Sequence, residues 1–300
     1  MSLTNASQLY IHLGPPKTAT TSLQKAFQDY RSDSYYYGGI FYPRDKQQTL
    51  ADLILSRILK QSNKLPDSIE DQIRTNLKTY NKILISEERI LTIDKVANWK
   101  VKLSNLYSLL AEYDSTIILT VRNPIDAIPS YYQETFNGLP KSLQNNLSDF
   151  IKSDYCKIFR YKYFIDYLKN IGFTKVILVD YRELIRGKCT FNDFISQSES
   201  SNNQPIELVQ LNKSKKNNDS RLSSRVSLKG FISKKIAIIP KPKVLKGKAY
   251  SKVFLDLLPN TKISKNKKLP IINAHDDNLK VFLDEYDQIL KQMGASKTHN

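Results

Sequence analysis

The chain has 300 residues, of which 40% are hydrophobic, and it carries a formal net charge of +17. A chain of this size and apolar content can bury a substantial core, so one α/β domain with insertions is expected. Its two cysteines, Cys156 and Cys189, have no metal-like spacing, which argues against a disulfide framework and a zinc site. No apolar stretch approaches the roughly 20 residues needed to span a bilayer, and no signal-peptide pattern is seen.

The most informative segment lies near the start of the chain. Residues 9–13 are short and apolar and end at Gly14, which predicts a buried strand. Two prolines then stiffen a loop, but they have no N–H groups to offer a ligand. The donors must come from Lys17 and from the unpaired amides and hydroxyls of residues 18–22, which open a helix with Leu23, Phe27 and Tyr30 on its apolar face.

Amides, hydroxyls and an ammonium that point at one spot are suited to binding a phosphate. A nucleotide-triphosphate P-loop fits poorly, because that motif needs a glycine directly before the lysine and Pro16 stands there. An ordinary strand-loop-helix junction with a solvated lysine stays open as the plain structural alternative.

After this loop the pattern alternates between helix and strand. Residues 34–43 indicate a loop with a short strand, residues 82–85 a short apolar strand, and helical periodicity covers residues 47–61, 68–80 and 102–113.

A second candidate phosphate motif begins at Arg122. The β-branched run Ser115–Val121 predicts a buried strand, so Arg122 follows its carboxyl end, where open α/β sheets bind ligands. Pro124 suits the first turn of the next helix, and Pro129 predicts a kink or a restart near Ser130. The arginine fork and the serine hydroxyl are suitable donors to a phosphate, although both could also act as simple caps.

The rest of the chain predicts a helix over residues 158–170, a strand over 175–180 and an amphipathic closing helix over 276–293. Strands separated by helices predict a parallel sheet covered on both faces. Residues 212–268 hold seventeen Lys and Arg against two acidic residues. They are either a solvated segment, a basic lid over a polyanionic ligand, or a surface for an acidic substrate or anionic lipid headgroups. The segment lacks the interleaved aromatics of a nucleic-acid stacking platform.

The two motifs together resemble those of the sulfotransferases that use PAPS (3′-phosphoadenosine 5′-phosphosulfate). Residues 11–24 are similar to the family's 5′-phosphosulfate loop, and the pattern R-x-P-x5-S-x-Y from Arg122 to Tyr132 is similar to its 3′-phosphate motif. The resemblance implies a P-loop-like sulfotransferase fold with a central parallel sheet flanked by helices. It implies a single domain over residues 1–300, with residues 212–268 as a lid or insertion within it.

The same resemblance implies in-line transfer of a sulfuryl group from PAPS to a hydroxyl or amine, with a carbohydrate or glycolipid as the leading acceptor and no metal demanded. Lys17 would stabilise the leaving phosphate. The implied cofactor-binding residues are Pro16, Lys17, Thr18, Ala19, Thr20, Thr21, Ser22, Arg122 and Ser130. The family's late basic-glycine clamp has two partial matches, at residues 228–230 and 245–247.

One residue of the loop departs from the family pattern. Ala19 stands where the family has glycine, and its methyl group restricts left-handed dihedral angles and can crowd the cofactor. We expect the fold to tolerate alanine if this residue is already helical.

The acceptor must lose a proton, and family members use a histidine or a glutamate that follows a short strand. His12 lies inside a predicted strand, where a satisfied core histidine is expected, while His275 and His299 lie in no matching motif. Glu87 and Glu88 occupy the glutamate position, and because side chains alternate along a strand only one can serve, with Glu87 slightly preferred. A helix start capped by Ser86 is the structural alternative.

These observations favour a cytoplasmic, bacterial sulfotransferase. Two other functions stay open: a kinase-like transferase that depends on another nucleotide, and a non-catalytic basic protein that binds nucleic acid or anionic membranes.

Overall fold

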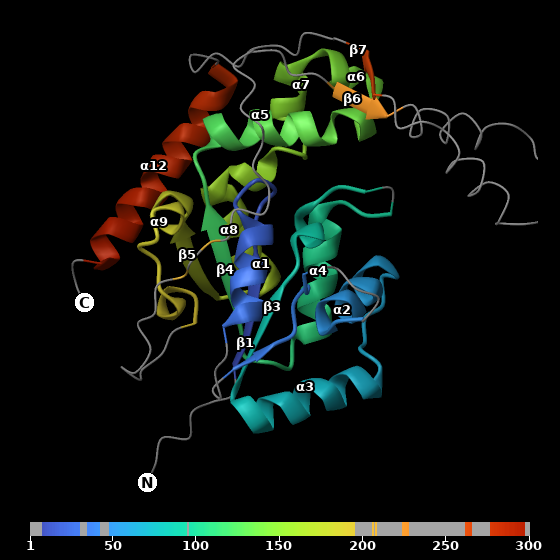
Figure 1. Ribbon diagram of the computed structural model, residues 1–300, viewed down its shortest axis with the longest axis vertical. Helices are drawn as coiled ribbons and strands as arrows, with labels where there is room; N and C mark the ends of the chain where they lie inside the picture. Colours follow the sequence, from blue (N-terminus) through green and yellow to red (C-terminus); the bar gives the residue numbers. More distant parts are fainter. Residues whose placement is uncertain are drawn as a thin grey trace, which may run out of the picture. The chain divides into compact units, whose positions relative to one another are not determined.

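The computed structural model describes residues 8–30, 35–42, 48–94, 96–195, 206, 208, 224–227, 262–265 and 277–297 (Figure 1). The chain divides into two compact units. The larger comprises Met1–Tyr131, Leu147–Ser214 and Ile272–Asn300, and the smaller comprises Tyr132–Asn146 and Lys215–Ile271.

The larger unit is built on a five-stranded sheet in which all paired strands run parallel, in the order β2-β3-β1-β4-β5. The strands are β1 (Gln8–Leu13), β2 (Tyr36–Tyr37), β3 (Lys82–Ser86), β4 (Ser115–Val121) and β5 (Lys175–Asp180). The predicted α/β fold with a parallel sheet flanked by helices is therefore confirmed. Because β1 lies at the centre, the chain reaches β3 on one side of it and β4 on the other, and ligands of open α/β sheets bind near such reversals.

The predicted helices are all present, with ends that differ by a few residues. The helical elements with residues in the larger unit are α1 (Thr20–Asp29), α2 (Leu50–Leu59), α3 (Asp67–Tyr80), η1 (Glu88–Leu91), α4 (Trp99–Leu110), α5 (Pro124–Thr135), α7 (Leu147–Lys152), η3 (Lys157–Phe159), α8 (Tyr161–Ile171), α9 (Tyr181–Ile185), η4 (Phe191–Asp193) and α12 (Asp277–Lys297). Helix α2 starts later than predicted because Thr49 and Asp52 form a capping box, each side chain accepting from the other's backbone N–H.

Helix α5 runs without interruption through Pro129, so of the two predicted outcomes the restart near Ser130 is wrong, and the kink stays a prediction. The start of this helix is capped by Asn123, whose side chain accepts from the N–H of Ile125 at 2.9 Å. Pro129 removes only one backbone donor, the one that would bond back to Ile125, and the helix continues around that loss.

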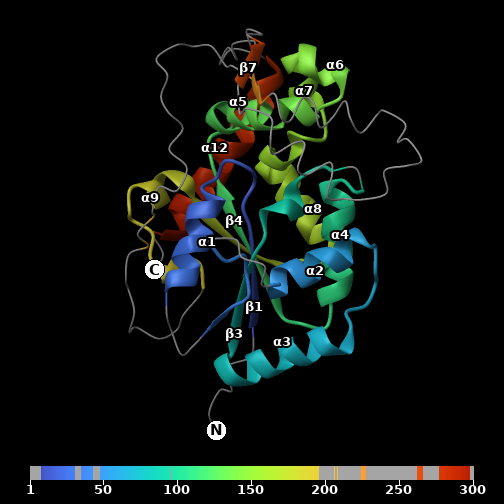
Figure 2. The same ribbon diagram turned by 45° about the vertical axis from the view of Figure 1, so that its right-hand side comes forward.

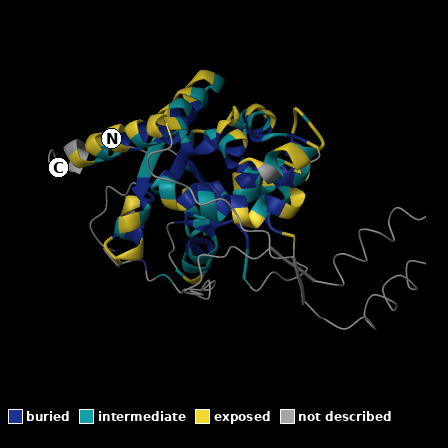
Figure 3. Ribbon diagram, turned by 90° about the horizontal axis from the view of Figure 1, so that it is seen from above, coloured by how far each residue is buried: buried dark blue, intermediate teal, exposed yellow. Residues whose placement is uncertain are grey.

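Helices cover both faces of the sheet (Figure 2). On one face, α1, α9 and η4 enclose a core cluster that includes Tyr10, Phe27, Ile118 and Phe191. On the opposite face α4 and α8 meet through Trp99, which is fully buried and packs against Phe164. Figure 3 shows the central strands β1, β3 and β4 mainly in the buried colour, with the exposed colour on the outer turns of the helices.

His12 ties together three strands of the sheet. Its side chain is fully buried, with Nδ1 2.7 Å from Ser86 Oγ on β3 and Nε2 3.1 Å from Thr120 Oγ1 on β4. Burial lowers the pKa of His12 to about 3, so the ring is neutral at physiological pH. The expected role as a satisfied core histidine is confirmed.

In the smaller unit, the described elements are the end of α5, η2 (Phe136–Gly138), α6 (Lys141–Asn145) and the antiparallel pair of β6 (Ser224–Ser227) with β7 (Lys262–Lys265). Apart from β6 and β7, the predicted lid over residues 212–268 lies outside the described residues. So do the two basic-glycine segments, His275 and His299.

Within the described part of the chain, no helix combines the length and the apolar character needed to cross a membrane. In the described part of the chain, Cys156 and Cys189 form no disulfide, and both are buried. Burial raises the pKa of the Cys156 thiol well above its ordinary value.

Candidate functional site

The candidate residues gather at one edge of the sheet. Because parallel strands end at the same edge, the turn that follows β1, the Glu87–Glu88 pair after β3, Arg122 after β4 and Tyr181 after β5 all lie there. The sequence predicted this edge for the first three, whose strands are direct neighbours in the order β3-β1-β4.

The loop after β1 is closed by its own hydrogen bonds. Thr18 is fully buried, and both its amide, at 3.2 Å, and its hydroxyl, at 2.7 Å, donate to the carbonyl of Pro15. The expectation that Thr18 offers unpaired donors is therefore wrong, because the loop uses both of them. Gly14 is required here, since a Cβ at this position would lie 2.3 Å from Thr20 Oγ1.

Two residues of the loop adopt left-handed backbone conformations. Lys17 has a φ of 72° and Ala19 a φ of 62°. Ala19 precedes the first helical residue and is not itself helical, so the condition under which alanine was expected to be tolerated is not met. For an alanine this conformation costs about 1–2 kcal/mol, because Cβ approaches the following carbonyl oxygen.

Exchange of Ala19 for glycine should therefore stabilise the protein, by about 0.5–1 kcal/mol after the larger chain entropy of glycine is counted. Ala26→Gly is the matched control, since Ala26 lies inside α1 and the same change should destabilise by about 0.5–1 kcal/mol. The measurement is the free energy of unfolding in urea. Equal shifts of the same sign for both variants would show that Ala19 is not strained.

The first turn of α1 supplies the donors of the candidate site. The first amide bonded within the helix is that of Leu23, which reaches the carbonyl of Ala19 at 3.0 Å. The amides of Thr20, Thr21 and Ser22 precede it, and a helix offers such amides no internal partner. Thr20 Oγ1 is also buried and finds no hydrogen-bond partner among the described residues. Together with the positive end of the helix dipole, this turn suits an anion.

Arg122 joins the second motif directly to this loop. Its Nη1 donates to the carbonyl oxygen of Lys17 at 2.5 Å, across 105 positions of sequence. Its guanidinium stacks over the ring of Tyr181, with Cζ 4.6 Å from the ring centroid. Its Nε is buried and has no hydrogen-bond partner in the described structure. The structure thus brings the two predicted phosphate motifs together and leaves a buried donor between them.

Sequence reasoning missed the residue that fixes the backbone of Arg122. Tyr161, the first residue of α8, is fully buried, and its hydroxyl accepts from the Arg122 N–H at 2.8 Å and donates to the Arg122 carbonyl at 2.7 Å. Desolvation raises the pKa of Tyr161, so the phenol keeps its proton. No local pattern around Tyr161 signals this role, because its partner is 39 positions away.

The two glutamates after β3 have different surroundings. Glu87 is 1% exposed and caps η1 by accepting from the N–H of Arg89 at 2.8 Å. The guanidinium of Arg89 donates to both of its carboxylate oxygens, at 3.0 Å and 2.6 Å, and also to Asp52 on α2 at 2.7 Å. Glu88 is the first residue of η1 and is only half-buried. A helical turn does start at this pair, as the structural alternative expected, but Glu87 caps it and not Ser86, whose Oγ contacts His12.

A buried lysine holds the segment that carries these glutamates. Lys102 on α4 is fully buried, and its ammonium donates to the carbonyls of Arg89 at 2.9 Å and Thr92 at 3.0 Å. It also pairs with Asp94 at 2.6 Å. Burial works to raise the pKa of Asp94, but the hydrogen bonds from Lys102 and from the amides of Ala97 and Val96, together with the charge of Lys102, outweigh it and hold that pKa below its usual range.

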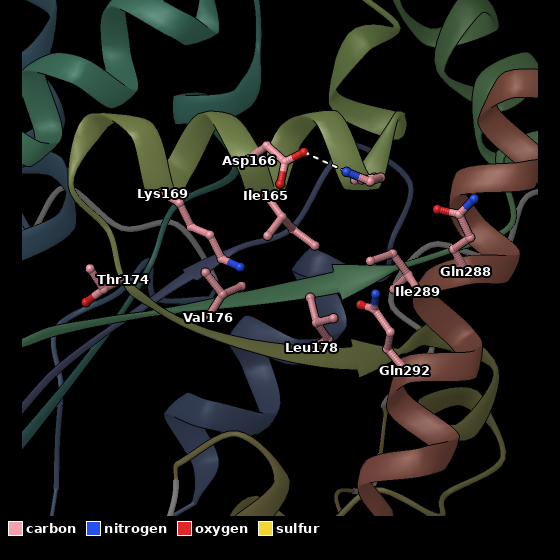
Figure 4. Close-up of a pocket in the computed structure, with 10 residues that line it drawn as sticks. Ile165, Asp166, Lys169, Thr174, Val176, Leu178, Gln288, Ile289 and Gln292 are labelled. Atoms are coloured by element: carbon pink, nitrogen blue, oxygen red, sulfur yellow. Dashed lines mark hydrogen bonds and ion pairs between the residues drawn. The ribbon is translucent and has the colours of Figure 1, made fainter.

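The predicted donor Ser130 is half-buried on α5, six positions beyond Pro124, which corresponds to about 9 Å along the helix axis, and its place in the site stays a prediction. A pocket of about 320 Å³ lies between α8, β5 and α12, with Val176, Leu178 and Ile289 among its lining residues (Figure 4). None of its lining residues belongs to the predicted site.

Comparison with known proteins gives limited information. No family model matches the chain, and no curated protein sequence matches it. Among solved structures, the chain is similar to the crystal structure of a sulfotransferase from Alicyclobacillus acidocaldarius, with 14% identity and a TM-score of 0.38 over 59% of this chain and 74% of that one. A likeness of this degree says nothing about activity, so function is argued from the site residues.

Proposed function

We propose that this chain is a sulfotransferase that moves a sulfuryl group from PAPS to a hydroxyl or amine of an acceptor. The observation that carries the proposal is the hydrogen bond from Arg122 to the carbonyl of Lys17, which unites the two motifs that resemble the family's phosphate sites. Two independent motifs that meet in space are harder to explain as a simple helix junction than either motif alone.

The residues present fit a ligand with two phosphates. The amides of Thr20, Thr21 and Ser22 and the ammonium of Lys17 would hold the 5′ end, and the buried, unpartnered Nε of Arg122 would donate to the ligand from the side, with Ser130 as a further donor. When bound, PAPS supplies the activated sulfuryl group. Lys17 and the fixed amides would neutralise charge that develops on the leaving oxygen, the type of stabilisation that contributes most to many enzymes.

The acceptor is proposed from the family resemblance alone. A carbohydrate or glycolipid hydroxyl is the leading class, and the basic residues 212–268 would attract an acidic acceptor or an anionic membrane surface. A glutamate after β3 would remove the proton of the acceptor.

The test is a thermal-shift and calorimetric titration with PAP (the desulfonated cofactor), ADP, and ATP with magnesium. PAP should stabilise the native state most, by about 2.7 kcal/mol at a hundred times its dissociation constant. Lys17→Ala should weaken PAP binding, whereas Lys25→Ala, in the helix that follows the loop and paired with Asp29, should not.

Other rankings would overturn the proposal in distinct ways. Stronger stabilisation by ATP with magnesium would indicate a kinase-like transferase. Salt-sensitive binding of polyanions that survives both Lys17→Ala and Arg122→Ala would indicate a non-catalytic binding protein.

A further inference from the structure

Arg122 donates a hydrogen bond to the backbone of the loop, a contact that an arginine does not need if its only role is to bind a phosphate. Its Nη1 is committed to the carbonyl of Lys17, a residue in the left-handed conformation. The guanidinium plane rests on Tyr181, and Tyr161 holds the peptide of Arg122 from both its N–H and its C=O. Arg122 is thus held in place by Tyr181 and Tyr161, and its hydrogen bond to Lys17 constrains the conformation of the loop.

The orientation of the Lys17 carbonyl matters for the donors that follow. A left-handed backbone conformation is unfavourable for most residues other than glycine. It persists only where the surrounding structure fixes it. Lys17 and Ala19 are two such residues directly before the first turn of α1. A charged donor bonded to the Lys17 carbonyl stabilises this turn and, with it, the direction of the amides of Thr20 to Ser22.

We propose that Arg122 is a positioning residue for the 5′-phosphate loop, in addition to any contact with a 3′-phosphate. By holding the Lys17 carbonyl it keeps the loop in the conformation that binds an anion, and Tyr161 holds Arg122 in place for this task. The inference rests on the proposed function for the identity of the nucleotide. The positioning role requires that Arg122 contributes to binding even when the ligand has no 3′-phosphate.

The experiment compares ligands with and without that group. Calorimetry with PAP and with adenosine 5′-phosphosulfate, which lacks the 3′-phosphate, is run on the wild type, Arg122→Met and Tyr161→Phe. We expect Arg122→Met to lower the affinity for adenosine 5′-phosphosulfate by about 10- to 100-fold, the loss typical of a charge-assisted hydrogen bond. Tyr161→Phe should lower the same affinity by a smaller factor. Arg182→Met is the matched control, because Arg182 also follows a strand end but pairs with Asp180.

A second readout needs no ligand. Hydrogen exchange of the amides of residues 17–22 should be faster in Arg122→Met and in Tyr161→Phe than in the wild type, and unchanged in Arg182→Met. If Arg122→Met does not fold, Tyr161→Phe decides the question by the same two measurements.

The outcomes separate the two proposals. If the variants lose affinity for PAP but keep wild-type affinity for adenosine 5′-phosphosulfate and wild-type exchange, Arg122 is only a 3′-phosphate ligand and the positioning role is overturned. If the wild type binds neither nucleotide, the proposed function fails, and the exchange rates of the loop still support or overturn the positioning role.

Discussion

On the proposed function, Glu88→Gln should slow sulfuryl transfer by about 10²–10⁴-fold, the usual contribution of a general base. The sequence slightly favoured Glu87, but both oxygens of Glu87 accept hydrogen bonds from Arg89 inside the protein. Glu88 begins η1 at the same edge of the sheet and is only half-buried, so it is the carboxylate that we propose as the base.

Glu87→Gln should have a different signature. It removes the charge from a buried carboxylate that caps η1 and pairs with Arg89, so we expect the free energy of unfolding to decrease by about 1.5–3 kcal/mol. Any loss of turnover should accompany this loss of stability.

The two glutamine variants are compared by transfer of radiolabelled sulfate from PAPS to glycans, glycolipids and simple alcohols, together with urea unfolding. If Glu87→Gln folds normally and loses turnover while Glu88→Gln keeps it, Glu87 is the base. If both variants retain near wild-type turnover, neither glutamate serves.

Lys102→Met should destabilise the protein by about 3 kcal/mol or more. The change keeps most of the side-chain volume but leaves the carbonyls of Arg89 and Thr92 buried without their donor and removes the partner of Asp94. A loss of this size is a large share of the 5–15 kcal/mol that typically separates folded from unfolded protein.

Urea unfolding measures this loss, with Lys78→Met as the control. Lys78 is exposed in the last turn of α3, so its exchange should change stability by no more than about 0.5 kcal/mol. Equal stability of the two methionine variants would mean that Lys102 does not support the segment of η1. A lower turnover of Lys102→Met under conditions where it stays folded would further link that segment to catalysis.

The parts of the fold set by local pattern could be predicted from the sequence. The apolar runs of β4 and β5 have the predicted bounds, and the edge of the sheet that carries Lys17, Glu87 and Arg122 follows from parallel strands. These features depend on neighbouring residues and on general topology, which a single sequence reveals.

The parts set by distant contacts could not be predicted in this way. The contact from Thr18 to the carbonyl of Pro15 is local, but it depends on the left-handed backbone at Lys17 between them, which the sequence does not signal. The roles of Tyr161 and Lys102 depend on partners in other elements, and a tyrosine or lysine at a helical position gives no local sign of them. The cap of α5 by Asn123 differs from these contacts, because an asparagine directly before Pro124 is a recognisable helix-cap pattern in the sequence.

The two buried thiols give the molecule its own reporters of opening. Burial shields both thiols from alkylating reagents and also raises the pKa of the Cys156 thiol, so the folded chain should label slowly at Cys156 and at Cys189. Cys189 packs in the cluster beneath α1, whereas Cys156 lies directly before η3. The relative labelling rates of these natural probes therefore distinguish local opening of the cluster that contains Cys189 from unfolding of the whole larger unit.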